Sequence, residues 1–158
     1  VNWRSSPKGT MSSRFYKNFP PSKINSPNPI KNYLEADEVD DIYYYRQDKY
    51  MYSELRKTMK SKDTLYQWRR KYVRENKNNL CPTLTANMGT GGHNVPLILT
   101  DEGIRKLTPR ECFNFQGYPK TFKLPSEMAN SNLYKQAGNS VSVPLIAKLA
   151  KIIREVLI

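Results

Sequence analysis

RKLTPRECFNFQGYP, at residues 105–119, contains a well-specified start of a helix. Its middle carries the signals of a helix start, because Thr108 suits the N-cap, Pro109 the first helical position and Glu111 the third position of a capping box. Gly117 ends the helix after about two turns. The sequence therefore predicts a short, well-capped helix after Thr108.

A β-hairpin is predicted directly before this helix. The apolar runs 95–100 and 104–107 flank Asp101-Glu102-Gly103, which has the chemistry of a tight turn. Upstream of the hairpin, residues 81–86 predict a further strand, and residues 87–94 predict a flexible loop with three glycines.

Residues 64–76 alternate in a way that predicts one continuous strand. Few of its side chains could form a dry core, so we expect it to carry a functional surface. The strand would place Trp68, Arg70, Tyr72 and Arg74 on one face and Gln67, Arg69, Lys71 and Val73 on the other.

The ends of the chain differ in character. Residues 1–28 predict an extended segment with one strand near residues 14–16, and short helices are expected after Pro29 and over residues 52–59.

After Pro144, apolar residues recur with helical period to the end of the chain. Two interpretations of this terminal helix stay open: it docks onto something outside the chain, or it packs on the chain's own sheet. Its apolar residues are Leu145, Ile146, Leu149, Ile152, Ile153, Val156 and Leu157.

The length and composition exclude several classes of protein. A chain of 158 residues fits one compact domain, or a small domain with an appendage. No segment approaches the ~20 apolar residues of a membrane span, so no membrane partner is expected. Two cysteines and one histidine supply neither a disulfide framework nor a structural zinc site. We therefore expect no metal, and a location in a reducing, cytoplasmic compartment.

The net charge of +12 predicts a polyanionic partner, most simply nucleic acid. Residues 45–78 hold 11 basic and 4 acidic side chains, so 34 residues carry an excess of +7. A solvated face is the ordinary interpretation of such a run. Here, however, aromatic residues alternate with the cations over residues 66–74, as expected of a surface that meets both phosphates and bases.

Three segments together resemble the bacterial cytosine-5 DNA methyltransferases. Residues 105–119 resemble the penultimate signature motif of that family, and YKQAGNSVSVP, at residues 134–144, resembles the final one. CPTLTANMGTGGHNVP, at residues 81–96, is similar to the stretch that ends the variable target-recognition region. Order and spacing agree with the family over residues 64–158, whereas a lone glycine-rich loop would be weak support.

Family motifs that carry the chemistry are absent from the sequence. The glycine-rich cofactor motif, the Pro-Cys nucleophile loop and the Glu-Asn-Val motif do not occur. Cys81 precedes its proline, and Cys112 lies on the capped helix, so we interpret both as structural. The resemblance implies no catalytic residue in this chain, which is expected to be inactive alone. Whether it is a proteolytic fragment, an engineered piece or one polypeptide of a split enzyme stays open, as do its target sequence, its stability alone and its oligomeric state.

The resemblance implies an α+β fold: a small β-rich DNA-recognition domain with short helices, then a C-terminal helix that packs on a Rossmann-like large domain absent from this chain. Residues 1–130 would form the target-recognition domain, including the motif at residues 105–119. Residues 131–158 would belong to the cofactor-binding domain. The expected partners are double-stranded DNA and the large catalytic domain or subunit of the same enzyme, in the cytoplasm of a bacterium.

The DNA-binding residues are assigned by chemistry and by this resemblance. Gln67 would enter the space vacated by the flipped cytosine, although an exposed strand glutamine is an equal interpretation. Arg70 and Arg74 would read guanine with their forked guanidinium groups. Phosphate contacts would come from Arg69, Lys71 and Lys77, and Tyr72 would add an aromatic surface. A second recognition loop would comprise Thr85, Asn87, Gly89, Gly91 and Gly92, with His93 as an ordinary loop residue.

The resemblance also assigns a cofactor, S-adenosylmethionine, held mainly by the missing large domain. Asn139 and Ser140 would lie beside it, with Gly138 allowing a tight turn. The leading hypothesis is thus the target-recognition part of a cytosine-5 methyltransferase of a restriction-modification system. Two others stay open: a stand-alone DNA-binding module without chemistry, and a small basic RNA-binding protein.

Overall fold

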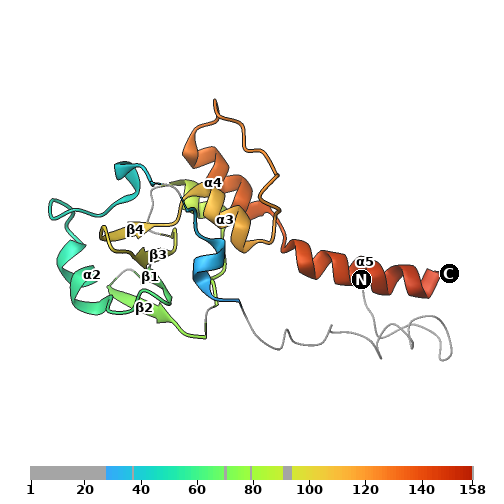
Figure 1. Cartoon of the computed structure of the whole chain (residues 1–158), viewed down its shortest axis with the longest axis horizontal. Coiled ribbons are helices and arrows are strands. Elements are labelled where there is room, and N and C mark those ends of the chain that lie inside the picture. The colour runs from blue at the N-terminus through green and yellow to red at the C-terminus, as the bar shows by residue number, and fades with distance from the viewer. Residues whose placement is uncertain (1–27, 37, 70, 79, 91–93, 158) are drawn as a thin grey trace.

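The computed structural model describes residues 28–36, 38–69, 71–78, 80–90 and 94–157. Its centre is an antiparallel four-stranded sheet in the order β2-β1-β3-β4. Short helices cover both faces of the sheet, and one long helix leaves the body (Figure 1). This confirms the predicted α+β class; the strand expected near residues 14–16 lies outside the described residues. The strands are β1 (Leu65–Arg69), β2 (Tyr72–Asn76), β3 (Leu97–Leu99) and β4 (Ile104–Lys106).

Residues 64–76 form a hairpin, so the prediction of one continuous strand was wrong. β1 and β2 pair in register from Leu65 opposite Asn76 to Arg69 opposite Tyr72. The chain reverses between them without glycine, proline or asparagine, and the alternation of side chains therefore gave no sign of the turn.

The turn also changes which side chains share a face. Gln67 lies opposite Arg74, and residues opposite each other in a ladder point to the same side. Gln67, Arg69, Tyr72 and Arg74 consequently share one face of the hairpin, which corrects the predicted split between them. Trp68 and Val73 share the other face.

The second hairpin, β3–β4, is as predicted. Leu97 lies opposite Lys106 and Leu99 opposite Ile104. Gly103 has a φ of 137°, a backbone conformation that side chains disfavour, and its carbonyl accepts hydrogen bonds from the backbone and hydroxyl of Thr100 at 2.8 and 3.0 Å.

Each face of the sheet has its own apolar core. On one face, α2 (Tyr52–Thr58), the helix predicted over residues 52–59, buries Leu55 and Met59 against Tyr66, Val73 and Leu97. On the other face lie the helices that Figure 1 shows together at the right of the sheet. They are α3 (Pro109–Phe115) and α4 (Asn130–Asn139), and they share a core with Leu65, Met88, Ile98, Phe113, Tyr134 and Ala137.

The remaining short elements are 3-10 helices. These are η2 (Ile30–Tyr33), η3 (Asp41–Tyr43) and η4 (Ala86–Thr90). The helix expected after Pro29 is therefore present as η2. Two predictions around η4 were wrong: residues 81–86 form no strand, and residues 87–90 form a helical turn rather than a flexible loop.

The packing of α4 on η4 explains this difference. A Cβ on Gly138 would lie 2.1 Å from the carbonyl carbon of Thr85 and 2.3 Å from the nitrogen of Ala86. The backbone of η4 and the segment before it thus lies directly against α4, where no strand can pair with it. Gly138 allows this close approach and lies within α4, not in a turn as the sequence suggested.

Helix α3 is capped as predicted. The Thr108 hydroxyl accepts from the Glu111 nitrogen at 3.1 Å, and the Glu111 carboxylate accepts from the Thr108 nitrogen at 2.8 Å. Arg105 on β4 donates two hydrogen bonds of 2.7 Å to the same carboxylate, and the Glu35 nitrogen donates another of 3.1 Å. Both charged side chains are almost fully buried, at 4% and 0% exposure.

The two signature motifs meet where α3 ends. Gly117 has a φ of 85°, and a Cβ there would lie 2.5 Å from the ring of Pro144. The Gln116 carbonyl accepts from the Val143 nitrogen at 2.8 Å, and its side-chain amide donates to the Ala137 carbonyl at 3.2 Å. The end of one motif therefore fixes the beginning of the terminal helix.

The terminal helix, α5 (Val143–Leu157), forms as predicted and projects from the body in Figure 1. Leu145, Ile146 and Ile153 are exposed by 44–45%, which leaves its apolar face open. None of the helices in the described part of the chain has the length and apolar character of a membrane span. The division after residue 130 stays a prediction, although α4 shares the core of the sheet and α5 is the one described helix that projects from it.

Candidate nucleic-acid interface

A cleft of about 440 Å³ lies between the β1–β2 hairpin and the segment that leads into η4. Two stretches that are separate in the sequence, and that the sequence analysis assigned to DNA recognition, form its two sides. The lining includes Gln67, Arg69 and Arg74 from the hairpin and Thr85, Asn87 and Asn94 from the other side.

The hairpin side supplies the charge. Arg69 and Arg74 are exposed, and Gln67 between them is only 8% exposed. Among the residues that the structure describes, no carboxylate lines the cleft, so no acidic side chain of its described lining neutralises the guanidinium groups. Forked donors beside an amide are suited to the phosphates and the base edges of a nucleic acid.

The hairpin end extends this surface beyond the cleft. Lys71 is exposed in the turn, and Tyr72 is 57% exposed on the same face as Arg74. Lys77 is exposed just after β2. Arg70, the other predicted base reader, lies outside the described residues.

The second side of the cleft is polar and uncharged. Thr85 and Asn87 are exposed. Gly89 packs against α4, where a Cβ would meet the Ser131 carbonyl oxygen at 2.4 Å, so its missing side chain has a reason inside the protein. Gly91, Gly92 and His93 lie outside the described residues. Asn94 was not predicted; its place directly after the glycine-rich stretch was the available signal.

Asn139 and Ser140 lie at the end of α4 and are not among the residues that line this cleft. The Asn139 side chain is exposed. The Ser140 hydroxyl donates to the Ala137 carbonyl at 2.7 Å, which leaves its oxygen free to accept. The exposed Asn139 amide and the Ser140 hydroxyl oxygen could each form a hydrogen bond with a polar group of a cofactor. They would cover only one side of such a molecule.

Neither cysteine has the surroundings of a nucleophile. Burial raises the pKa of Cys81 to about 12, and burial, with Cys81 and Glu111 nearby, raises the pKa of Cys112 well above its ordinary value. Both thiols are therefore protonated at neutral pH. Among the described residues, no group of three or more His, Cys, Asp or Glu side chains could hold a metal ion.

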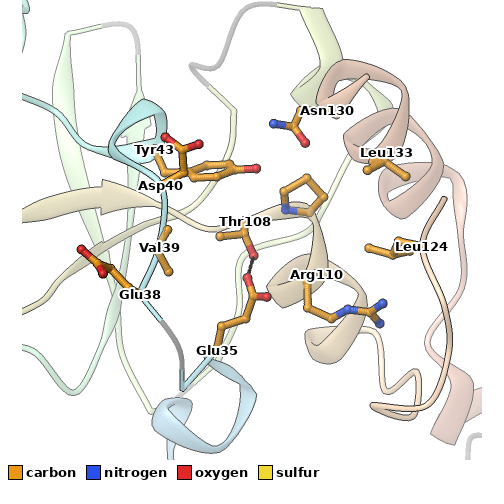
Figure 2. Close-up of a pocket in the computed structure, with 11 residues that line it drawn as sticks. Glu35, Glu38, Val39, Asp40, Tyr43, Thr108, Arg110, Leu124, Asn130 and Leu133 are labelled. Carbon is orange, nitrogen blue, oxygen red and sulfur yellow. Dashed lines mark hydrogen bonds between the residues drawn. The ribbon is translucent and has the colours of Figure 1, made fainter. Parts of the chain in front are cut away.

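A different pocket, of about 290 Å³, lies where η3 meets α3 and α4 (Figure 2). Figure 2 shows Glu35, Glu38 and Asp40 on one side of it and Arg110 on the other, with the Thr108 hydroxyl bonded to Glu35. Three carboxylates make this pocket unsuited to a phosphate, so we do not assign it to DNA.

Comparison with known proteins shows the family to which this chain belongs. The pattern of the C-5 cytosine-specific DNA methylase family matches residues 4–155. The chain belongs to this family.

Two relatives with similar sequences are type II methyltransferases. The chain is 61% identical over 142 residues to M.Bsp6I of Bacillus sp. (strain RFL6), covering 86% of this chain and 44% of the relative. It is 30% identical over 143 residues to M1.ScrFI of Lactococcus lactis subsp. cremoris, covering 87% and 34%. The chain thus spans less than half the length of these relatives.

A solved structure shows the same fold. The Dnmt2 methyltransferase of S. pombe aligns with a TM-score of 0.61 at 16% identity, over 86% of this chain and 44% of that one. The small sheet with its helices is therefore the fold of one part of a methyltransferase.

Proposed function

We propose that this chain is the DNA-recognition part of a DNA (cytosine-5)-methyltransferase of a type II restriction-modification system. The observation that carries the proposal is the cleft. Arg74, a predicted base reader, and Arg69, a predicted phosphate contact, line the same 440 Å³ space as the predicted loop residues Thr85 and Asn87, and no carboxylate is among the described residues of its lining. Family membership supplies the reaction class, and this geometry favours a role in holding and reading the duplex.

Each side chain has a role set by its position. Arg74, exposed at the cleft, reads a base pair together with Arg70, because a forked guanidinium can bond guanine O6 and N7 at once. Arg69, Lys71 and Lys77 hold phosphates. Tyr72 offers a ring at the end of the hairpin on which a base can stack, and Thr85 and Asn87 contact base edges from the opposite side.

Gln67 can support base flipping only from inside the cleft, because its side chain is largely buried. Gln67 lines the cleft and is only 8% exposed, so its amide acts on a base only when the edge of the duplex enters that space. Flipping costs a few kcal/mol of stacking and pairing, and an amide bonded to the unpaired guanine offsets part of this cost.

The chemistry itself requires the large domain. S-adenosylmethionine supplies the methyl group, and Asn139 and Ser140 would hold it from this side. The open apolar face of α5 packs on that domain, because apolar surface left in water costs about 25 cal/mol per Å². Both cysteines stay outside the reaction as protonated thiols.

Arg74→Ala tests the recognition role. The 158-residue chain should enrich a defined motif from a pool of randomised duplexes, and the variant should lose discrimination at one base pair by about 1–3 kcal/mol. Binding to unrelated duplexes should fall much less. Fluorescence anisotropy of single duplexes that differ at that base pair measures the effect.

Arg154→Ala is the matched control, since it removes an exposed arginine on α5, remote from the cleft. It should leave the enriched motif unchanged. An equal loss on all duplexes would make Arg74 a phosphate contact, and a wild-type chain that binds no duplex would overturn the proposed function.

Methyl transfer should require a second polypeptide. The pure chain is expected to transfer no radiolabelled methyl group to duplex DNA, and activity should appear when a polypeptide carrying the Pro-Cys and glycine-rich motifs is added. Cys112→Ser should leave the reconstituted activity in place. Transfer by the pure chain, lost in Cys112→Ser, would contradict both the division of labour and the structural role of this thiol.

A further inference from the structure

The recognition cleft has an apolar part whose role the proposed function leaves open. Leu80, Cys81 and Pro82 are consecutive in the chain, and all three line the cleft. Cys81 packs against the core and Pro82 is buried, whereas Leu80 is 55% exposed. Of the exposed large apolar side chains in the described part of the chain, Leu80 is the one that lines this cleft.

The backbone of Leu80 is fixed to the end of β2. An exposed leucine by itself needs no explanation, because folded proteins leave many apolar atoms in water. Here, however, the Leu80 carbonyl accepts a hydrogen bond from the Asn76 side-chain amide at 3.0 Å. The Leu80 nitrogen donates to the Lys77 carbonyl at 3.4 Å. These two bonds hold an apolar side chain in water beside the cleft.

This position is close to Arg74, the proposed base reader. Arg74 and Asn76 are two residues apart on β2, so they point to the same face of the sheet, about 7 Å from each other. Because the Asn76 amide bonds directly to Leu80, the leucine comes next along the same surface. Successive bases of a strand are about 3.4 Å apart along the duplex axis. A duplex that Arg74 reads therefore brings base pairs a few steps away to Leu80.

The major-groove edges of the bases offer one apolar group that suits a leucine. Guanine, adenine and cytosine present hydrogen-bond donors and acceptors there, and thymine adds a methyl group at C5. 5-Methylcytosine carries the same group at the same ring position. The leucine side chain has no donor or acceptor, so phosphates and polar base edges form no hydrogen bond with it. A C5-methyl group is its chemical complement.

We propose that Leu80 is a specificity-determining residue that packs on the C5-methyl group of a pyrimidine near the guanine that Arg74 reads. The inference rests on the proposed function and adds an apolar contact to the polar reading by Arg74. Such a methyl group has two sources. Thymine supplies it as part of a target sequence, and 5-methylcytosine is what C-5 methylation of cytosine produces. Against an unmodified cytosine, Leu80 loses this contact.

Single methyl groups in the target duplex test the inference. In the motif that the 158-residue chain enriches, each thymine is replaced by uracil and each cytosine by 5-methylcytosine, one position at a time. Fluorescence anisotropy measures the affinities. At one position the duplex with the methyl group should bind about fourfold more tightly, as expected for the burial of one methyl-sized group. In Leu80→Ala the two duplexes should bind alike. An effect of uracil identifies thymine as the source, and an effect of 5-methylcytosine identifies a methylated site.

Two further variants serve as controls. Leu145→Ala shortens a leucine that is 45% exposed on α5, outside the lining of the cleft, and should keep the fourfold preference. Leu80→Met keeps an apolar side chain of similar size and should also keep the preference, which separates packing on the methyl group from a change in the fold. All of these variants should bind unrelated duplexes as the wild type does.

The outcomes separate this inference from the proposed function. If no position responds to a methyl group, or if the preference survives in Leu80→Ala, the leucine reads no methyl group, while base reading by Arg74 still stands. If Leu80→Ala weakens binding equally with and without the methyl group, Leu80 supports the wall of the cleft and the inference is wrong. A wild-type chain that enriches no motif would overturn the proposed function, and this inference with it.

Discussion

Glu111→Gln is expected to destabilise the fold by about 3–5 kcal/mol, because it leaves a buried arginine without its counter-charge. The Glu111 carboxylate is fully buried and accepts four hydrogen bonds, two of them from Arg105. A glutamine of the same shape presents an NH₂ group to one of these donors. Urea denaturation followed by circular dichroism measures the change in the free energy of unfolding.

Glu155→Gln is a suitable control for this change. Its side chain is exposed on α5, and surface substitutions of this kind change stability by about 0.5 kcal/mol or less. A cost below about 1 kcal/mol for Glu111→Gln would show that the Arg105 ion pair does not hold β4 to α3.

What the sequence revealed about the fold was local. The capping box of Thr108 and Glu111 lies within four residues, and Gly103 marks the turn of the β3–β4 hairpin in the sequence. Both could be predicted because the residues that form them are neighbours in the chain. The partnership of Arg105 with Glu111 could not, since two charges are buried together only once the strand and the helix have packed.

Some residues that line the candidate cleft were named from the sequence, but their arrangement was not predicted. In one continuous strand, Gln67 and Arg74 would point to opposite faces, because side chains alternate along a strand. The chain instead turns after Arg69, with no turn residue to mark the position. The pairing that results places Gln67 and Arg74 on the same face. The other side of the cleft comes from a segment held by α4, a contact between residues about fifty positions apart. That Asn94 lines the cleft could therefore be seen only in the folded structure.

This arrangement connects the two signature motifs to recognition. Gln116 and Gly117 at the end of α3 contact Ala137 and Pro144 of the final motif. The same final motif, through Gly138, touches the backbone that carries Thr85. One helix, α4, thus lies between the predicted cofactor side and the predicted base-reading side of the molecule.

Gly138→Ala is expected to disturb this junction strongly. The added Cβ would lie 2.1–2.3 Å from backbone atoms of Thr85 and Ala86, so no rotation of a side chain relieves the contact. α4 must then shift from η4, although Ala137 beside it is fully buried. Overpacking of this kind costs typically 1–3 kcal/mol and occasionally more. Urea denaturation should show this loss in the free energy of unfolding.

The sign of this effect is what makes it decisive. Alanine is favoured over glycine inside a helix by about 0.8–1.0 kcal/mol, so helix propensity alone predicts that Gly138→Ala stabilises α4. Only the contact with Thr85 and Ala86 predicts the opposite sign. Because that contact also sets the position of Thr85 and Asn87 against Arg74, the folded fraction of the variant should discriminate less between duplexes than the wild type. A variant that is more stable and equally selective would show that α4 does not position the recognition cleft.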